Sequence, residues 1–239
     1  MKTVYYLLPI FNEAGGLARL LQELHAQILP KNWVYQILAI NDGSRDASLA
    51  ILEEQKKNYR LDVISYTPNR GIPEVLKVGL TALARRVEDT DAVVVMESDG
   101  TSDLSLIPRF LEAMESGADI VIGSRSIPGG AYKNFPLERK LGSLATNFFL
   151  RCLWRLPGVS DYTIFYRAYR GRSIKQLIEK GLIFQSKKSF AANGELLLQL
   201  APYAPVIREL PLQYDYGLKK GKTKMKLFET LWEYMRIKR

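Results

Sequence analysis

Over its first 125 residues the chain alternates short apolar runs with longer segments of helical periodicity. The runs 3–10, 34–40, 61–66, 91–96 and 118–124 are rich in Val, Ile, Leu and Tyr, which predicts strands. The segments 14–29, 45–59, 73–87 and 105–117 repeat apolar residues every three or four positions, which predicts helices. Nearly continuous apolar strands alternating with helices indicate an α/β fold with a mostly parallel central sheet flanked by helices.

The second half of the chain departs from this rhythm. A loop rich in Gly, Pro and aromatic residues at 126–139 precedes a long predicted helix at 139–156. We expect strands at 161–170 and 206–216, short helices at 173–181 and 194–201, a basic loop at 219–226 and an amphipathic helix at 227–239. No repeat or linker is visible, so the sequence predicts one domain over 1–239.

Composition and charge narrow the class of protein. Hydrophobic residues make up 47% of the 239 residues, enough for a substantial core, and the formal net charge is +9. The last 25 residues carry eight Lys or Arg against three Asp or Glu, a net +5. A basic tail favours an anionic partner such as nucleic acid, anionic lipid or a phosphorylated ligand.

Several common chemistries are disfavoured. Cys152 is the only cysteine, so no intrachain disulfide can form, and a cytosolic-facing location fits. His25 is the only histidine and lies in a predicted helix, which disfavours a Ser-His-Asp hydrolase or a histidine metal site. The first apolar run is too short for a signal sequence, and no stretch reaches the ~18 apolar residues of a membrane span.

Carboxylates gather where the predicted strands end. Glu97 and Asp99 follow the fourth strand at i and i+2, a spacing that can present both from one side, and Gly100 allows a tight turn. Glu13 follows the first strand and Asp42 the second, so one edge of the sheet would carry four acidic residues.

Four carboxylates at one edge repel each other unless a cation or a ligand with hydrogen-bond donors compensates. Hard divalent cations take oxygen ligands, and Mg²⁺ combines one or two carboxylates with water and substrate phosphates. We therefore expect a metal-bound nucleotide diphosphate. Neither GxxxxGK[ST] nor GxGxxG follows a strand, which disfavours a P-loop or dinucleotide site.

These motifs resemble family 2 glycosyltransferases, in particular the catalytic domain of dolichol- or polyprenyl-phosphate mannose synthases. The order "LLPIFNE", "NDGSRD", "VVVMESDGTSD", "DIVIGSR", "DYTIFYRAYR", "IRELPLQY" and "GKTKM" covers about Thr3 to Met225. The resemblance implies a GT-A-type nucleotide-sugar-binding fold, a GDP-mannose or UDP-sugar donor, Mg²⁺ or Mn²⁺, and inversion at the anomeric carbon. It places the nucleotide and metal in residues 1–125 and the acceptor in residues 126–239.

The resemblance also implies roles for individual residues. Pro9, Phe11, Glu13 and Asp42 match positions that hold the base and ribose, and Glu97, Asp99 and Thr101 match the metal motif. Ser98 and Lys224 complete the expected donor-binding set, and Asp99, Arg125 and Arg139 the expected catalytic set. The chain departs from the family pattern where Glu97 replaces Asp, Thr101 replaces Gln, "NDGS" replaces "DDGS" and "TIFYR" replaces "TSGFR", which leaves the sugar open.

The acceptor expected from the resemblance is a polyprenyl or dolichyl phosphate. A phosphate monoester is already anionic at pH 7 and needs no strong general base. Asp161 is the only candidate for such a base in the sequence, and a structural role for Asp161 is equally favoured. The predicted helix at 139–156 and the terminal helix carry aromatic faces with basic flanks, which suits a membrane surface or packing on the sheet.

We therefore expect a peripheral enzyme on the cytoplasmic face of a membrane, with a membrane-anchoring subunit as a further candidate partner. Two alternatives remain open at this point. One is a family 2 transferase with a saccharide or other non-lipid acceptor. The other is a non-catalytic protein that binds polyanions or anionic lipid; the acidic sheet edge and the lack of a nucleic-acid motif argue against nucleic acid.

Overall fold

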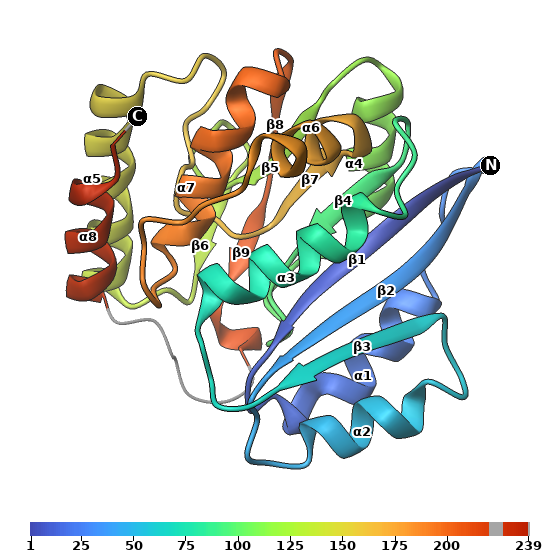
Figure 1. The fold of residues 1–239 in the computed structure, drawn as a ribbon. Helices are drawn as coiled ribbons and strands as arrows, with labels where there is room; N and C mark the ends of the chain where they lie inside the picture. The colour runs from blue at the N-terminus through green and yellow to red at the C-terminus, as the bar shows by residue number, and fades with distance from the viewer. Residues whose placement is uncertain (220–226, 239) are drawn as a thin grey trace.

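A seven-stranded mixed sheet forms the centre of the molecule, with strand order β3-β2-β1-β4-β7-β5-β8 (Figure 1). The computed structural model describes residues 1–219 and 227–238, and only the backbone of residues 227 and 228. The strands are β1 (Lys2–Ile10), β2 (Trp33–Asp42), β3 (Leu61–Tyr66), β4 (Ala92–Val95), β5 (Ile120–Ser124), β7 (Arg167–Arg170) and β8 (Ile207–Pro211). β7 alone is antiparallel to its neighbours β4 and β5. The predicted α/β fold with a mostly parallel sheet is confirmed.

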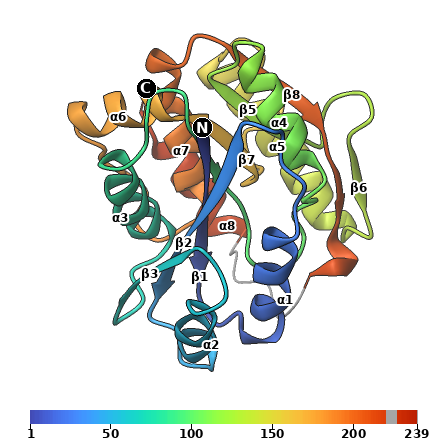
Figure 2. The ribbon, with the colours of Figure 1, turned by 90° about the vertical axis from the view of Figure 1, so that its right-hand side faces the viewer.

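Helices cover both faces of this sheet, as the apolar strands require. They are α1 (Ala14–His25), α2 (Ser48–Gln55), α3 (Ile72–Ala84), α4 (Leu106–Glu115), α6 (Gly171–Lys180) and α7 (Ala191–Leu200). In Figure 2, α3 and α6 lie to the left of the strands, and α1 and α4 to the right. The buried apolar residues of strands and helices form one continuous core.

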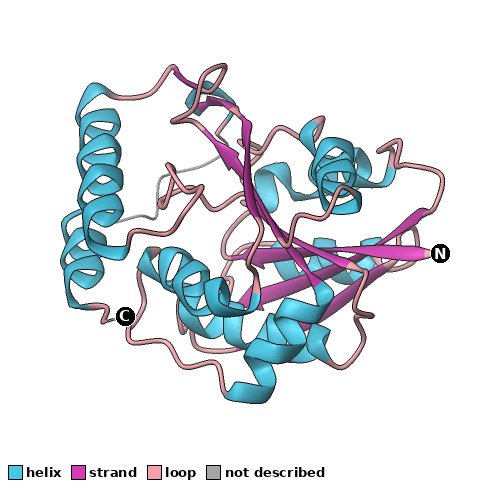
Figure 3. Ribbon diagram, turned by 90° about the horizontal axis from the view of Figure 1, so that it is seen from above, coloured by secondary structure: helices cyan, strands magenta, loops and turns pink. Residues whose placement is uncertain are grey.

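Two further helices stand apart from the strands. α5 (Leu137–Trp154) and α8 (Leu227–Arg236) contact each other, and α8 also contacts α7 (Figure 3). Within the described residues no helix is both long and apolar enough to cross a bilayer.

The second half differs from the sequence prediction at three places. The expected loop at 126–139 contains a short strand, β6 (Ala131–Lys133). The expected strand at 161–170 pairs only over β7, because Asp161 Oδ1 accepts the backbone N–H groups of Thr163 and Ile164 and bends the chain there. The expected strand at 206–216 divides after β8, and β9 (Gln213–Asp215) pairs with β6 in a separate sheet. A 3₁₀ turn, Tyr216–Leu218, follows β9.

Candidate active site

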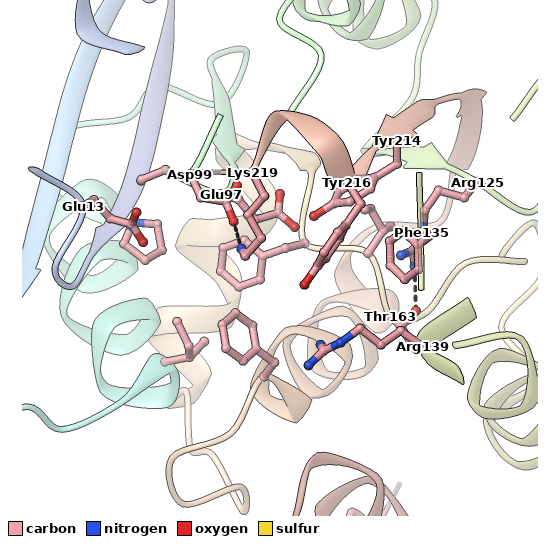
Figure 4. Close-up of a pocket in the computed structure, with 16 residues that line it drawn as sticks. Glu13, Glu97, Asp99, Arg125, Phe135, Arg139, Thr163, Tyr214, Tyr216 and Lys219 are labelled. Carbon is pink, nitrogen blue, oxygen red and sulfur yellow. Dashed lines mark hydrogen bonds and ion pairs between the residues drawn. The ribbon is translucent and has the colours of Figure 1, made fainter. Parts of the chain in front are cut away.

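The carboxyl ends of β1 and β4 open into a cavity of about 160 Å³ that both halves of the chain line (Figure 4). From the first half come Pro9, near the end of β1, Glu13, which follows β1, and Glu97, Ser98 and Asp99, which follow β4. These residues meet because β4 pairs with β1 in parallel. The structure therefore brings five of the expected site residues of the first half into one cavity.

The loop after β4 holds its two carboxylates from behind. Gly100 has a φ of +85°, which an L side chain rarely adopts, and so permits the sharp turn. The backbone N–H and the hydroxyl of Thr101 donate to Asp99 Oδ1, at 3.2 and 2.5 Å. Ser102 Oγ donates to Glu97 Oε2 at 3.0 Å. The loop thus fixes two neighbouring carboxylates in one orientation.

This fixed arrangement is electrostatically costly without a cation. Burial, and secondarily the charge of Asp99, raises the pKa of Glu97 to about 7. The ammonium of Lys219, which follows the 3₁₀ turn, forms an ion pair with Asp99 Oδ2. The Lys219 ammonium therefore already neutralises the Asp99 carboxylate within the cavity.

The donor set fits a divalent cation. Glu97 and Asp99 supply hard oxygen ligands, and the Lys219 ammonium stands in for a cation on Asp99. The hydroxyl of Ser98 lines the same cavity and has no hydrogen-bond partner among the described residues, although Ser98 is only 4% exposed. Among the described residues no three His, Cys, Asp or Glu cluster as metal ligands. Two carboxylates are nevertheless enough for Mg²⁺, which takes its remaining ligands from water and phosphate.

Three of the expected site residues that the structure describes lie elsewhere. The carboxylate of Asp42 is buried and accepts bonds from Asn69 Nδ2 and from the N–H groups of Arg70 and Gly71, at 2.7 to 2.9 Å. It therefore shapes the turn before α3, whose first residue, Ile72, lines the cavity. Phe11 lies outside the cavity lining, and Thr101 lines a separate hollow. Lys224 lies outside the described residues.

Arg125 is present in the cavity wall, but another residue neutralises its charge. Its guanidinium bonds both carboxylate oxygens of Asp161, at 2.8 and 2.7 Å, and Thr163 Oγ1 at 2.7 Å. Burial alone would raise the pKa of Asp161, but the Arg125 charge and the hydrogen bonds from Arg125 and Asn147 together outweigh burial and lower that pKa to about 2. Asp161 is fully buried, so it serves as the structural partner of Arg125 and is unsuited to act as a general base.

Arg139, from the first turn of α5, is another cation in the described part of the cavity wall. It lines the cavity and forms no ion pair with a carboxylate among the described residues. Aromatic rings flank this end of the cavity: Phe135 lies 5.7 Å from Tyr214 and 5.0 Å from Tyr216, centroid to centroid. The expected phosphate-binding role therefore suits Arg139 better than Arg125.

Sequence reasoning missed much of the second-half wall. Beyond Arg125 and Arg139, this wall comprises Phe135, Thr163, Ile164, Phe165, Phe190, Tyr214, Tyr216 and Lys219. The aromatic letters of "KNFPLER" and "QYDY" were a signal for three of them. Phe190, just before α7, gave no signal, because only tertiary packing brings it to the cavity.

The helix that carries Arg139 presents an apolar outer face. Leu137, Leu141 and Phe148 are 70%, 56% and 72% exposed, whereas Leu150 and Trp154 are buried beneath the helix. The same helix also carries Lys140 and Arg151, and Arg155 follows its last residue. On the adjacent α8, Trp232 and Met235 are also exposed. The inner face of α5 thus packs on the rest of the protein, and its apolar outer face is exposed.

The fold and an acidic cavity at the carboxyl edge of the sheet define a GT-A-type glycosyltransferase. More specifically, the chain belongs to glycosyl transferase family 2, whose model matches residues 6–178. Polyprenol monophosphomannose synthase of Mycolicibacterium smegmatis is 32% identical over 214 residues, which cover 85% of this chain and 77% of that protein. Undecaprenyl-phosphate mannosyltransferase of Micrococcus luteus is 31% identical over 215 residues, which cover 87% of this chain and 85% of that protein.

Two further comparisons extend over almost the whole chain. Dolichol-phosphate mannosyltransferase of Pyrococcus furiosus is 28% identical over 98% of this chain, which spans 62% of that protein. Glucosyl-3-phosphoglycerate synthase from Mycobacterium tuberculosis, solved with Mn²⁺, uridine diphosphate and glucosyl-3-phosphoglycerate, superposes with a TM-score of 0.68. That comparison covers 98% of this chain and 77% of the other at 16% identity, and it shows a shared fold.

Proposed function

We propose that the enzyme transfers a hexose from a nucleotide sugar to a polyprenyl phosphate at a membrane surface, with a divalent cation. The observation that carries this proposal is the position of Arg139. Its guanidinium lines the cavity, and its helix exposes an apolar face that begins two residues earlier, at Leu137. A ligand with an anionic head and an apolar chain suits both features. The names of the related enzymes support the same acceptor class.

The residues allow a direct displacement. Arg139 holds the acceptor phosphate, whose second pKa of about 6 leaves a nucleophilic oxygen at pH 7 without a base. That oxygen forms a bond to the anomeric carbon as the bond to the diphosphate breaks, so the configuration inverts. Glu97 and Asp99 would hold the cation, which neutralises charge on the departing diphosphate. The aromatic rings of Phe135 and Tyr216, which contact each other at this end of the cavity, would reduce the access of water to the reacting atoms.

Product analysis tests the proposal. The purified enzyme is incubated with GDP-mannose, UDP-glucose or UDP-galactose, with a polyprenyl phosphate in detergent, and with Mg²⁺, Mn²⁺ or chelator. We expect one donor to give a glycolipid that extracts into organic solvent, only with metal. Transfer to a free saccharide, with none to lipid phosphate, would favour the alternative acceptor class.

Replacement of Arg139 by Gln is expected to raise the KM for the acceptor about 10- to 100-fold, because one charge-assisted phosphate contact is lost. Stabilisation of the fold by the nucleotide diphosphate should not change. A short, water-soluble isoprenyl phosphate serves as acceptor, so that membrane binding plays no part. Lys140→Gln, the adjacent position outside the cavity lining, is the control. Equal KM values for the two variants would remove Arg139 from the acceptor site.

The exposed face of α5 is expected to bind anionic vesicles. Leu141→Ser combined with Phe148→Ser should weaken co-sedimentation with phosphatidylcholine–phosphatidylglycerol vesicles at least about tenfold, because two large apolar groups no longer leave water. Activity on the short acceptor should persist. The matched control, Ile28→Ser with Ile183→Ser, alters two exposed apolar residues elsewhere. Equal loss in both double variants would show that general surface hydrophobicity, rather than α5, binds the vesicles.

A further inference from the structure

We propose that Lys219 is an internal competitor for the metal position, and that it makes metal and nucleotide bind together. The inference rests on the proposed metal-dependent transfer. The ammonium of Lys219 occupies Asp99 Oδ2, so free metal must compete with a cation that the chain itself supplies. A metal–nucleotide complex also brings a diphosphate, which gives the displaced ammonium a new partner.

The chain holds Lys219 close to the acidic loop through ordered contacts. Asp215 Oδ1 accepts Gly217 N–H at 2.8 Å and Asn134 Nδ2 at 2.8 Å, which fixes the turn that precedes Lys219. The N–H of Lys219 donates to the Tyr216 carbonyl at 3.2 Å. The backbone oxygen of Leu218 lies 3.6 Å from where a Cβ on Gly100 would stand. The segment 215–219 therefore passes directly over the loop that carries Asp99.

The remaining oxygen of Asp99 offers no alternative to competition. Thr101 donates two hydrogen bonds to Oδ1, one from its N–H and one from its hydroxyl. A cation on Asp99 therefore meets the Lys219 ammonium at Oδ2. Both side chains of this pair are largely buried, with 17% and 8% exposed, so their attraction is screened less than at an open surface. Two cations sharing one carboxylate oxygen would repel each other.

This geometry couples the two ligands. When metal binds alone, its binding free energy is reduced by the free energy needed to displace the Lys219 ammonium from Asp99. When metal binds with a nucleotide diphosphate, the contact between the displaced ammonium and the diphosphate recovers part of that free energy. Because coupling is reciprocal, metal must then tighten nucleotide binding by the same factor as nucleotide tightens metal binding. Lys219 thus selects the metal–nucleotide complex over free metal.

Binding of Mn²⁺ without nucleotide tests the competition directly. Isothermal titration with MnCl2 alone compares wild type with the variants Lys219→Met and Lys219→Arg. The control variant is Lys175→Met, because Lys175 of the wild type forms an exposed ion pair with Asp89. We expect Lys219→Met to bind Mn²⁺ about tenfold more tightly, the order of one partly buried ion pair. Lys219→Arg retains the cation and should resemble wild type, as should the control.

The same titrations with GDP or UDP present test the coupling. Nucleotide should tighten Mn²⁺ binding more in wild type than in Lys219→Met. Equal Mn²⁺ affinity of wild type and Lys219→Met, with normal binding of the metal–nucleotide complex, would overturn the inference and leave the proposed function intact. Absence of Mn²⁺ binding in every protein, with or without either nucleotide, would overturn both.

Discussion

Asp99→Asn is expected to lower kcat/KM by about three orders of magnitude, with the fold unchanged. The amide keeps the size of the carboxylate and can still accept the bonds from Thr101, but it removes the charge that would hold the cation against the departing diphosphate. Initial rates over a range of donor concentrations, together with a Mn²⁺–nucleotide isotherm, measure the effect. Turnover and binding of the Mn²⁺–nucleotide complex should be lost together, because the same charge would hold the cation and stabilise the leaving diphosphate.

The matched control for Asp99→Asn lies four residues further along the same loop. Asp103 is exposed, and its Oδ1 accepts from the N–H and hydroxyl of Ser105 just before α4. Asp103→Asn should therefore leave turnover within about threefold of wild type. If Asp99→Asn also stayed within that range, the acidic loop would have no part in catalysis.

The second large effect concerns stability. Asp161→Asn is expected to reduce the free energy of unfolding by about 3–5 kcal/mol, because the buried Arg125 guanidinium would lose its counter-charge. Urea unfolding at pH 7, followed by circular dichroism, measures the loss. Asp89→Asn removes one partner of the exposed pair with Lys175 and should cost under about 1 kcal/mol. Similar losses in both variants would contradict the assignment of Arg125–Asp161 as the buried structural pair.

The stability difference between wild type and Asp161→Asn should depend on pH, because the pKa of Asp161 is lowered in the folded protein. The pKa of Asp161 is about 2 in the folded protein against an ordinary value of 3.8. The ion pair therefore contributes its stabilisation above about pH 4 and loses it as the pH falls toward 2. The stability gap between wild type and Asp161→Asn should narrow over that window. A gap that stayed constant from pH 6 to pH 2 would mean that the charge of Asp161 is not what stabilises the fold.

The first half of the fold could be predicted from the sequence because its elements depend on local patterns. Parallel strands end at one edge, so the acidic residues after β1 and β4 had to lie near each other. Asp42 also lies at the end of its strand, but its carboxylate binds the turn at residues 69–71 instead of lining the cavity. Strand order places a residue at the edge of the sheet, and hydrogen bonds then determine whether its side chain lines the cavity or binds a neighbouring turn.

The second half could be predicted less well because long-range pairings shape it. No local pattern shows that a strand will leave the main sheet after Pro211 and pair with β6. Likewise, the motif that contains Arg125 gives no sign that Asp161, 36 residues later, neutralises it. The contact between Lys219 and Asp99 spans 120 residues, so it too depends on the assembled fold.

The reversed direction of β7 determines where this enzyme can change. Because β7 runs antiparallel, the edge where β1 and β4 end is the edge where β7 begins, so the irregular segment before it reaches the cavity. Its residues Ile164 and Phe165 line the cavity without belonging to the paired strand. Sheet pairing thus constrains the four residues of β7, whereas hydrogen bonds to Asn147, Asp161 and Asn193 hold the backbone of residues 162–164. Because these bonds use backbone atoms, evolution or an engineer can alter side chains of the cavity wall here without disturbing the register of the sheet.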